Sequence, residues 1–447
     1  MRGMARFSRL LVAGVAVVAG LARAQPALTP ALLLEVAPGQ SIGVQRLAAS
    51  ADAQRGVPIY FIAGGPAVAP GEELLRRPAL FERLRTLGEV VLVEQRGAGS
   101  SQPNMDCDTR WALALDRVPS RAEVIADAER QFRSCGEALR ARGIDLARYR
   151  TEAYAADLLA VMRHLGHERV RLVAHSYGTM IALELLRAAP ERVERAVLAG
   201  VMGPGDALRD PAHHERVLAT LAAQVGLDPA RLQRQTAALL AQLKQHPVAA
   251  RTSAGVPIVL GHDDIARGLV QGLGRPLEAP TLPRVIAALA AGQHDKAAAW
   301  LQRVADGTHA ARTGPLARRA AAQHYLTVCA NAEPAERRAA RSAPSLFGHQ
   351  LHAPLPDACA AWGLPAAAAR PPVVAETPVL LVSAQLDVRT PHEQALAVAR
   401  TLPRSTLLTL AGAGHGEVLG PNSELDRLTT AFLRGETLST ATLPQSP

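Results

Sequence analysis

The chain has 447 residues, 48% of them hydrophobic, and a formal net charge of +9. It is therefore long and apolar enough to bury a sizeable core, and an α/β unit with a large insertion is compatible with this length. Nearly all of the positive charge comes from dispersed arginines and only 3% of the residues are aromatic, which excludes nucleic-acid binding as the main function.

Residues 1–24 are predicted to be a secretory signal peptide. Arginines precede an apolar stretch from Leu10 to Ala22, and an Ala-Arg-Ala triplet provides a cleavage site before Gln25. The apolar stretch is short for a membrane span, so an uncleaved anchor is the less favoured alternative. We therefore expect a periplasmic or secreted protein that keeps no stable membrane anchor, with a net charge of +5 after cleavage.

A buried strand is predicted from Val57 to Ile62, and it opens into a Gly-Gly-Pro turn at Gly64 and Gly65. A second break lies further along, where apolar β-branched residues over 170–174 give way to helical spacing over 180–186. Each break ends a strand that the pattern places inside a sheet. The second break carries a serine, which makes it the more informative of the two.

Ser176 stands at that break, between the small residues Ala174 and Gly178. A sharp strand-to-helix turn needs small side chains at these two positions, because the strand and the helix approach each other closely. The pattern is typical of a nucleophile elbow, although a plain Ser-Gly turn gives the same five residues. The rest of the chain has to distinguish the two readings.

A long segment, residues 204–370, separates two predicted core strands. It contains repeated helical patterns with proline and glycine between them, and it is too long for a connection within a core. We therefore predict a signal peptide, a core from 25–203, a helical cap inserted over 204–370, and the rest of the core from 371–447. Such a cap would wall off the site and select its substrates.

Two acid–base residues follow the cap. Asp387 comes just after a predicted strand at 377–383, and His415 lies between glycines in the loop after a strand at 405–410. In an open α/β sheet the loops at the carboxyl ends of the strands converge in space. Alone, Asp387 would be read as a turn aspartate and His415 as a surface histidine.

Ser176, Asp387 and His415 together appear in the order that a Ser-Asp-His triad has on such a sheet. A serine hydroxyl attacks only when a histidine takes its proton, and a carboxylate must orient that histidine. We therefore predict a serine hydrolase that works through an acyl-enzyme. For the oxyanion hole, the candidates are the backbone N–H of Tyr177 and that of Gly65, with Gly64 next.

The chain resembles the α/β-hydrolase fold and, within it, the proline iminopeptidase and tripeptidyl aminopeptidase family of serine peptidases. The motifs that carry the resemblance are spread over most of the chain, namely Ala63-Gly64-Gly65-Pro66, Val93–Ser101, His175–Thr179, Ala189–Val193 and the Asp387 and His415 loops. The resemblance implies a mostly parallel sheet flanked by helices. The predicted reaction needs no cofactor, and the adjacent pair His213-His214 lacks ligands at metal-binding spacing, so we predict no metal site. Two departures are that Ala67 stands where the family has glycine, and Glu94 where it commonly has aspartate.

The resemblance further implies an exported aminopeptidase that removes N-terminal residues from short peptides, with proline preferred or tolerated. Carboxylates of the cap would bind the substrate ammonium, and Asp263, Asp264 and Glu278 are the candidates, with a solvated acidic face as the plainer alternative. A small-molecule esterase or amidase on the same fold remains possible for this sequence. A third reading is a binding protein with a relic triad. The oligomeric state cannot be read from the sequence.

The four cysteines make an even set that an oxidising compartment would pair. Three pairings exist, and we predict the local one, Cys107 with Cys135 and Cys329 with Cys359, because each pair flanks a single segment. The resembled family also carries cysteines in segments like those of the second pair. Buried free thiols are the alternative. No cysteine pair has the Cys-x-x-Cys spacing of a metal or redox site.

Overall fold

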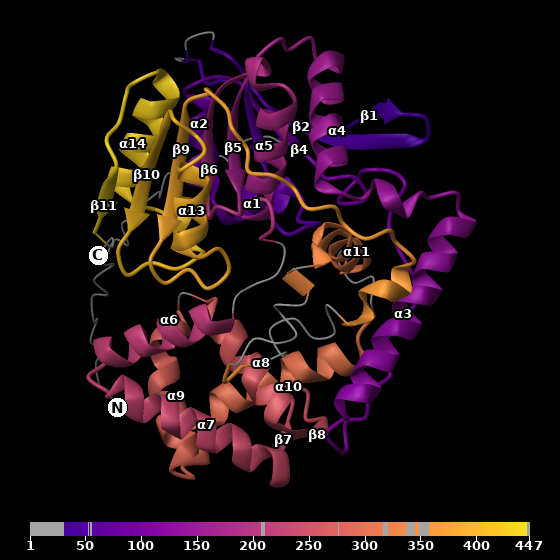
Figure 1. Cartoon of the computed structure of the whole chain (residues 1–447), viewed down its shortest axis with the longest axis vertical. Helices are drawn as coiled ribbons and strands as arrows, with labels where there is room; N and C mark the ends of the chain where they lie inside the picture. Colours follow the sequence, from indigo (N-terminus) through magenta and orange to yellow (C-terminus); the bar gives the residue numbers. More distant parts are fainter. Residues whose placement is uncertain are drawn as a thin grey trace, which may run out of the picture.

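The computed structural model describes residues 31–444 except 52, 54–55, 207–210, 276, 316–320, 335, 338–344 and 348–356. The predicted signal peptide, residues 1–24, lies outside the described residues. Within the described part, the centre is a nine-stranded sheet in the order β1-β2-β4-β3-β5-β6-β9-β10-β11 (Figure 1). Its strands are β1 (Leu32–Ala37), β2 (Gln40–Leu47), β3 (Ile59–Ile62), β4 (Val90–Val93), β5 (Val170–His175), β6 (Val193–Ala199), β9 (Val379–Ala384), β10 (Ser405–Leu410) and β11 (Ala441–Leu443).

The sheet is mostly parallel. Only the β1–β2 and β2–β4 pairs are antiparallel, and every other neighbouring pair in the described sheet is parallel. Parallel strands need helical crossovers, which cover both faces and explain why the core strands are apolar runs rather than alternating ones. The predicted α/β class with a mostly parallel sheet is confirmed.

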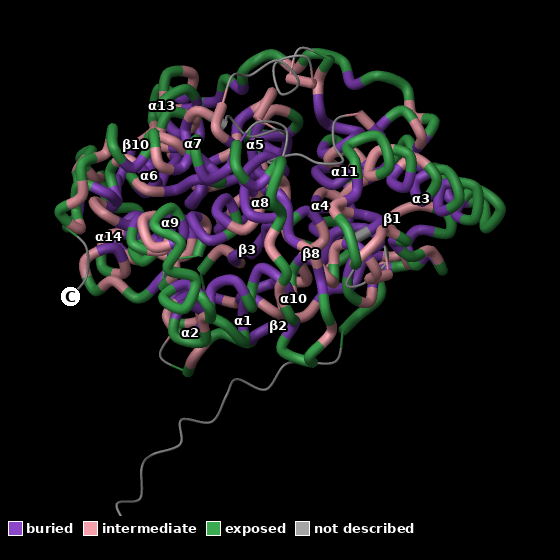
Figure 2. Tube along the Cα trace, turned by 90° about the horizontal axis from the view of Figure 1, so that it is seen from below, coloured by how far each residue is buried: buried purple, intermediate pink, exposed green. Residues whose placement is uncertain are grey.

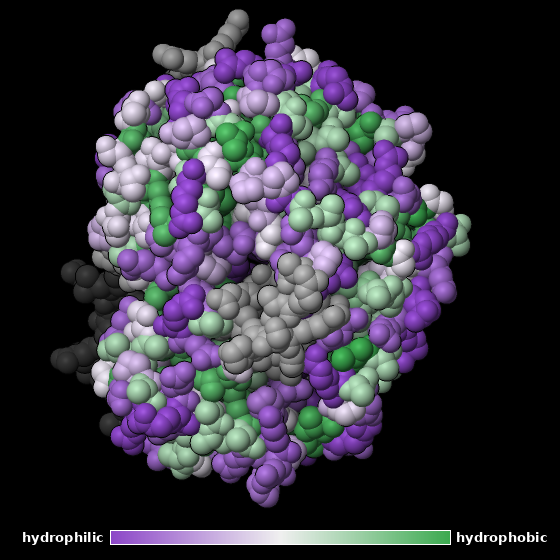
Figure 3. All heavy atoms as spheres, in the orientation of Figure 1, coloured by the Kyte–Doolittle hydropathy of each residue, from purple (hydrophilic) through white to green (hydrophobic). Residues whose placement is uncertain are grey.

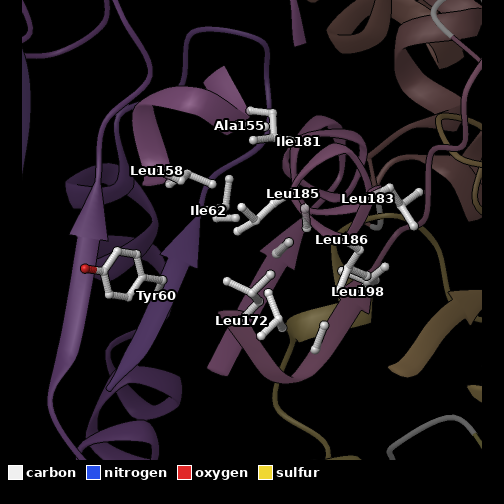
Figure 4. Packing of buried hydrophobic residues seen from close by; sticks show 14 of the residues in the cluster. Tyr60, Ile62, Ala155, Leu158, Leu172, Ile181, Leu183, Leu185, Leu186 and Leu198 are labelled. Atoms are coloured by element: carbon white, nitrogen blue, oxygen red, sulfur yellow. The ribbon is translucent and has the colours of Figure 1, made fainter. Parts of the chain in front are cut away.

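Helices cover both faces of the sheet. One face carries α4 (Thr151–His164), α5 (Tyr177–Ala188) and α13 (His392–Ala399), and the other carries α1 (Pro70–Arg76), α2 (Pro78–Arg85) and α14 (Ser423–Arg434). Strand β3 shows how the sequence serves both layers, since Tyr60 and Ile62 join the first cluster while Ile59 and Phe61 join the second. Figure 4 shows Tyr60 and Ile62 with side chains of α4 and α5 in the first cluster.

The carboxyl ends of five strands lie along one edge of the sheet. The register that aligns them pairs Ile62 with Ala174, His175 with Ala199, Ala199 with Val382, and Ala384 with Leu410. The loops that follow β3, β5, β6, β9 and β10 therefore meet at this edge. These loops carry the glycine turn and all three predicted triad residues.

A set of helices between β6 and β9 lies over that edge, in the lower half of Figure 1. We call it the helical cap, and its elements are α6 (Pro211–Gln224), α7 (Pro229–Gln245), the hairpin β7 (Val248–Arg251) and β8 (Pro257–Leu260), α8 (His262–Leu273), α9 (Leu282–Ala290) and α10 (Ala298–Thr313). Apolar side chains from these elements form a buried cluster of their own. The hairpin is an addition to the purely helical cap that the sequence predicts.

A further helix, α3 (Arg121–Ala141), belongs to the first part of the chain but packs far from the sheet, against α11 (Ala321–Asn331) and the 3₁₀ turn Asp357–Trp362. Phe132 of α3 stacks on Trp362 at 4.9 Å between ring centroids. This arrangement ties residues before and after the cap into one cluster, which the prediction of a simple core from 25–203 did not anticipate.

Both disulfides of the local pairing are present, Cys107–Cys135 and Cys329–Cys359, and they lie in this α3 cluster. Figure 2 shows buried chain running through both the sheet and the cap, and on the face in Figure 3 hydrophilic and hydrophobic residues are interspersed. Among the described helices, none combines the length and the hydropathy that crossing a membrane requires.

Candidate active site

Ser176 occupies the tight turn between β5 and α5. Its backbone has φ 55° and ψ −125°, a strained conformation for a residue other than glycine, and its N–H donates to Ala199 O at 2.9 Å. The turn brings α5 very close to strand β3, as shown by Gly178, where an added Cβ would lie 2.4 Å from Ile62 O. The small residue that the elbow pattern requires is thus dictated by the carbonyl end of the neighbouring strand β3.

His415 and Asp387 lie side by side on the loops after β10 and β9. His415 Nδ1 is 2.8 Å from Asp387 Oδ2, and both side chains are buried. A carboxylate only accepts, so Nδ1 carries the proton and Nε2 is left as the acceptor that a serine hydroxyl needs. The described structure therefore brings Asp387 and His415 into the relation that the triad prediction requires, with Ser176 lining the same cavity.

The Asp387 carboxylate has four donors. Its Oδ1 accepts from the N–H groups of Arg389 and Thr390 at 2.8 and 2.9 Å, and its Oδ2 accepts from Thr390 Oγ1 at 2.6 Å as well as from His415. Burial alone would raise the pKa of Asp387, but the attraction of His415 and these hydrogen bonds outweigh it and lower the pKa to about 2. The acid therefore stays ionised at every pH at which the histidine could act as a base.

A second histidine packs against the first. His175, the last residue of β5, stacks on His415 with ring centroids 5.0 Å apart, and its Nδ1 is 3.9 Å from the buried carboxylate of Glu73. Burial and the neighbouring His415 lower the pKa of His175 well below its ordinary value, so this ring is neutral. Gly200 lies against another side of the ring, where an added Cβ would be 3.0 Å from His415 Cε1. The His415 ring therefore has little room to rotate.

The predicted oxyanion donors lie beside the nucleophile. Tyr177 is the first residue of α5, where a helix leaves N–H groups without intrahelical acceptors, and a Cβ at Gly64 would lie 2.9 Å from Ser176 Cβ. Gly64 and Gly65 also line the cavity. The turn is shaped by Gln95, whose amide donates to Gly64 O at 2.9 Å and accepts from Ala67 N at 2.9 Å.

Ala67 is one of the two departures from the family motif, and it adopts φ 74°. L-residues pay about 1 to 2 kcal/mol in this left-handed region. We expect Ala67→Gly to raise the free energy of unfolding by about 1 kcal/mol, after the larger backbone entropy of glycine is subtracted. The measurement is the midpoint of urea unfolding. The matched control is Ala238→Gly at an exposed position in the interior of α7, which should lower the midpoint, and a lower midpoint for both variants would contradict the expected strain.

Glu94, the other departure, is structural. Its Oε2 accepts from the N–H groups of Ser100 and Ser101 at 2.7 and 3.0 Å. The glutamate side chain, longer than the aspartate of the family, fits because Gly43 and Gly99 have no Cβ. A Cβ at either glycine would lie within 2.4 Å of the carboxylate. Glu94 therefore holds the loop after β4 and lies outside the catalytic contacts.

A cavity of about 660 Å³ joins these groups to the cap, a size typical of small-molecule sites. Its lining includes Ser176, His415 and Gly65 from the core side and Asp263 and Asp264 from α8. Side chains from α3 and α11 complete the wall. The cavity therefore lies where the sheet edge, the cap and the α3 cluster meet.

The three carboxylates predicted to bind an ammonium differ in their surroundings. Asp264 is buried in ion pairs with Arg312 at 2.6 Å and Arg267 at 2.7 Å, so its charge is already neutralised. Asp263 lines the cavity with its carboxylate 3.7 Å from a ring nitrogen of the adjacent histidine. Glu278 pairs with Arg275 at 3.0 Å and is not among the described residues that line the cavity.

Asp206 is a cavity carboxylate that the sequence reasoning missed. It is half-buried on the loop after β6, accepts from Gly203 N at 2.8 Å, and forms no ion pair with any described residue. Burial raises the pKa of Asp206 to about 6, against the opposing effects of the Gly203 N–H, of the Gln394 side chain and of Arg370. Nothing in the local pattern marks this residue, because Gln394 of α13 and Arg370 lie far from it in the sequence.

His213 is another residue whose place could not be foreseen. The sequence shows only an adjacent histidine pair near the start of a helix, but the structure places His213 Nε2 2.8 Å from Asp387 O, with His213 buried. Val388, the residue after Asp387, is part of the apolar cluster of the cap. The first helix of the cap therefore contacts the loop that carries the triad acid.

Comparison with known proteins agrees with this geometry. A family model described as alpha/beta hydrolase fold matches residues 58–418. Serine protease Hip1, from both Mycobacterium tuberculosis and Mycobacterium bovis, is 26% identical over 388 residues, which cover 80% of this chain and 74% of the relative.

Solved structures of two enzymes also resemble the chain. A proline iminopeptidase from Mycobacterium smegmatis has a TM-score of 0.46 at 16% identity and covers 90% of this chain and 97% of its own. A thermophilic esterase from Thermogutta terrifontis has a TM-score of 0.42 at 15% identity, covering 91% and 98%. Similarities this low do not bear on the substrate. Because the family model spans most of the chain, the protein belongs to the α/β-hydrolase fold family.

Proposed function

We propose that the protein is an exported serine aminopeptidase that removes N-terminal residues from short peptides. The observation that carries the proposal is Asp206, an acid in the same cavity as Ser176 that forms no ion pair with any described residue. Its loop begins at Gly200, which touches His415, so the carboxylate belongs to the surroundings of the triad. A substrate ammonium would supply the missing cation. The similarity to a serine protease supports a peptide as the substrate.

The chemistry follows from the positions of the three residues. Ser176 Oγ attacks the scissile carbonyl while His415 Nε2 takes its proton, and the N–H groups of Tyr177 and Gly65 would hold the oxyanion. His415 then protonates the leaving amine, and a water molecule activated by the same ring cleaves the acyl-enzyme. Asp387 stays ionised throughout and stabilises the imidazolium.

Export is supported by two features. The N-terminal segment has the pattern of a signal peptide, and both cysteine pairs form disulfides, which persist in oxidising compartments. The disulfides lie in the α3 cluster that helps to wall the cavity. The wall of the cavity therefore contains disulfides that an oxidising compartment would preserve.

The test compares peptidyl arylamides with free and with acetylated amino termini, beside short aryl esters. We expect the purified mature protein to cleave only the free-amine arylamides at a useful rate. We expect Asp206→Asn to raise their KM by about 10- to 100-fold, because an ammonium–carboxylate hydrogen bond is lost. As the pH rises from 5 to 7 the wild-type KM should fall as Asp206 ionises, and in Asp206→Asn this fall should vanish.

Asp295→Asn is the matched control, since Asp295 is exposed at the start of a 3₁₀ turn away from the cavity. Its KM should equal that of the wild type at each pH. Equal cleavage of free and acetylated substrates would contradict an aminopeptidase. Cleavage of the aryl esters alone would instead establish an esterase on this fold.

A further inference from the structure

Six arginines of the described part of the chain line the cavity, and five of them are paired with carboxylates. These five are Arg76 with Glu72, Arg77 with Glu73, Arg121 with Asp357, and Arg267 and Arg312 with Asp264. The sixth, Arg389, differs. Its guanidinium makes neither a hydrogen bond nor an ion pair with any described residue, although it borders the same space as the triad.

The backbone of Arg389 is held firmly. Its N–H donates to Asp387 Oδ1 at 2.8 Å, and the preceding Val388 is buried in the apolar cluster of the cap. The side chain runs past the C-terminal end of α8, where a Cβ at Gly274 would lie 3.0 Å from Arg389 Nε. The missing side chain of Gly274 thus leaves space for the guanidinium against the helix, within the wall of the cavity.

We infer that Arg389 is the anchor for a substrate carboxylate. A guanidinium presents a planar fork of donors that matches a carboxylate with two parallel hydrogen bonds. Arg389 is exposed to solvent at the wall of the cavity, so the match of the two planar groups, more than any exclusion of water, would select the carboxylate. The inference rests on the proposed function in one respect, namely that the molecule carrying the carboxylate is a peptide.

Arg389 and Asp206 together describe the substrate more closely. Both residues line the cavity, and both belong to loops next to the triad. Neither the cation, Arg389, nor the acid, Asp206, has an ion-pair partner among the described residues. A short peptide with a free amino end and a free carboxylate would satisfy both, whereas an internal segment of a protein would satisfy neither. The cavity of about 660 Å³ accommodates a molecule of that size and not a folded chain.

The experiment measures cleavage of unmodified peptides by mass spectrometry. One pair of peptides has the same sequence and ends in either a carboxylate or a carboxamide. A second pair ends in a carboxamide and carries either glutamate or glutamine near that end. The first pair reports a C-terminal carboxylate and the second a side-chain carboxylate, so the two sources are distinguished. In the wild type we expect kcat/KM to favour the carboxylate by about 2- to 10-fold in at least one pair.

Arg389→Gln should reduce that preference to near unity by slowing the carboxylate peptide alone, and Arg389→Lys should retain part of it. An electrostatic effect on Asp387 would slow both members of a pair equally and leave the ratio unchanged. Arg427→Gln is the control, because Arg427 is an exposed arginine of α14, pairs with Glu424 and does not line the cavity. This variant should keep the wild-type ratio.

The inference is overturned if the wild type treats both members of both pairs alike, or if Arg389→Gln keeps the preference. If no peptide is cleaved and only aryl esters are, the proposed function fails separately. Calorimetric binding of the same four peptides to Ser176→Ala, with and without Arg389→Gln, then decides the anchor. Stronger binding of a carboxylate peptide that is lost with Arg389 supports it, and equal or absent binding rejects it.

Discussion

Replacing Ser176 with alanine should abolish turnover on every substrate that the protein hydrolyses. The loss of kcat should be at least about 10⁴-fold, because the cavity would retain its oxyanion donors and its binding groups but no nucleophile. The strained turn does not depend on the hydroxyl, since Gly178 and the carbonyl of Ile62 fix the approach of helix and strand. The temperature of unfolding should therefore stay within a few degrees of the wild type.

The measurement is steady-state kinetics with the best substrate from the arylamide and ester panel, together with thermal unfolding. Ser253→Ala is the control, because Ser253 is an exposed serine in the turn of the cap hairpin that bonds only to Asp306. It should keep full activity. A correctly folded Ser176→Ala protein with more than one hundredth of the wild-type rate would point to another nucleophile.

Asp387→Asn should lower kcat by about 10⁴-fold at neutral pH, an expectation taken from triads in general. The reason lies in the four donors around the carboxylate. An asparagine has one oxygen, and if it faces the N–H groups of Arg389 and Thr390, its amide N–H₂ faces His415 Nδ1. The ring must then accept at Nδ1 and carry its proton on Nε2, so it can no longer take the proton of Ser176.

A pH profile separates this tautomer effect from unfolding. Protonation of Asp387 should not lower the wild-type kcat above pH 3, because the pKa of Asp387 is about 2, whereas the titration of Asp206 acts on KM. The Asp387→Asn protein should keep the wild-type circular dichroism spectrum at neutral pH. If it retains more than a tenth of the wild-type kcat, Asp387 does not orient the histidine.

The elements that the sequence predicts well are those with a local cause. The strand predicted at 405–410 is found at those residues, because the periodicity of the side chains is set within the element itself. Ser176 could be found because its turn demands small neighbours in the sequence. The Asp387 and His415 loops could be found because parallel strands align their carboxyl ends.

The rest depends on contacts between distant segments. Asp206 and Arg389 are notable only for the partners that they lack, and partners of this kind come from other parts of the fold. Glu278 is predicted as a cap carboxylate near the site, but its carboxylate forms ion pairs with Arg275 and Arg303. The position of α3 against α11 is likewise decided by the match of two apolar surfaces, which no periodicity in either segment reveals.

The contact between the cap and the Asp387 loop limits how this enzyme could change during evolution. His213 bonds to the carbonyl of Asp387, and Val388 is packed inside the cap. A mutation in α6 would therefore disturb the reaction itself, whatever it did to substrate choice. The α8 wall and the α3 cluster contact the cavity without holding the acid, so new specificities should arise there first, with α6 nearly unchanged among relatives of different specificity.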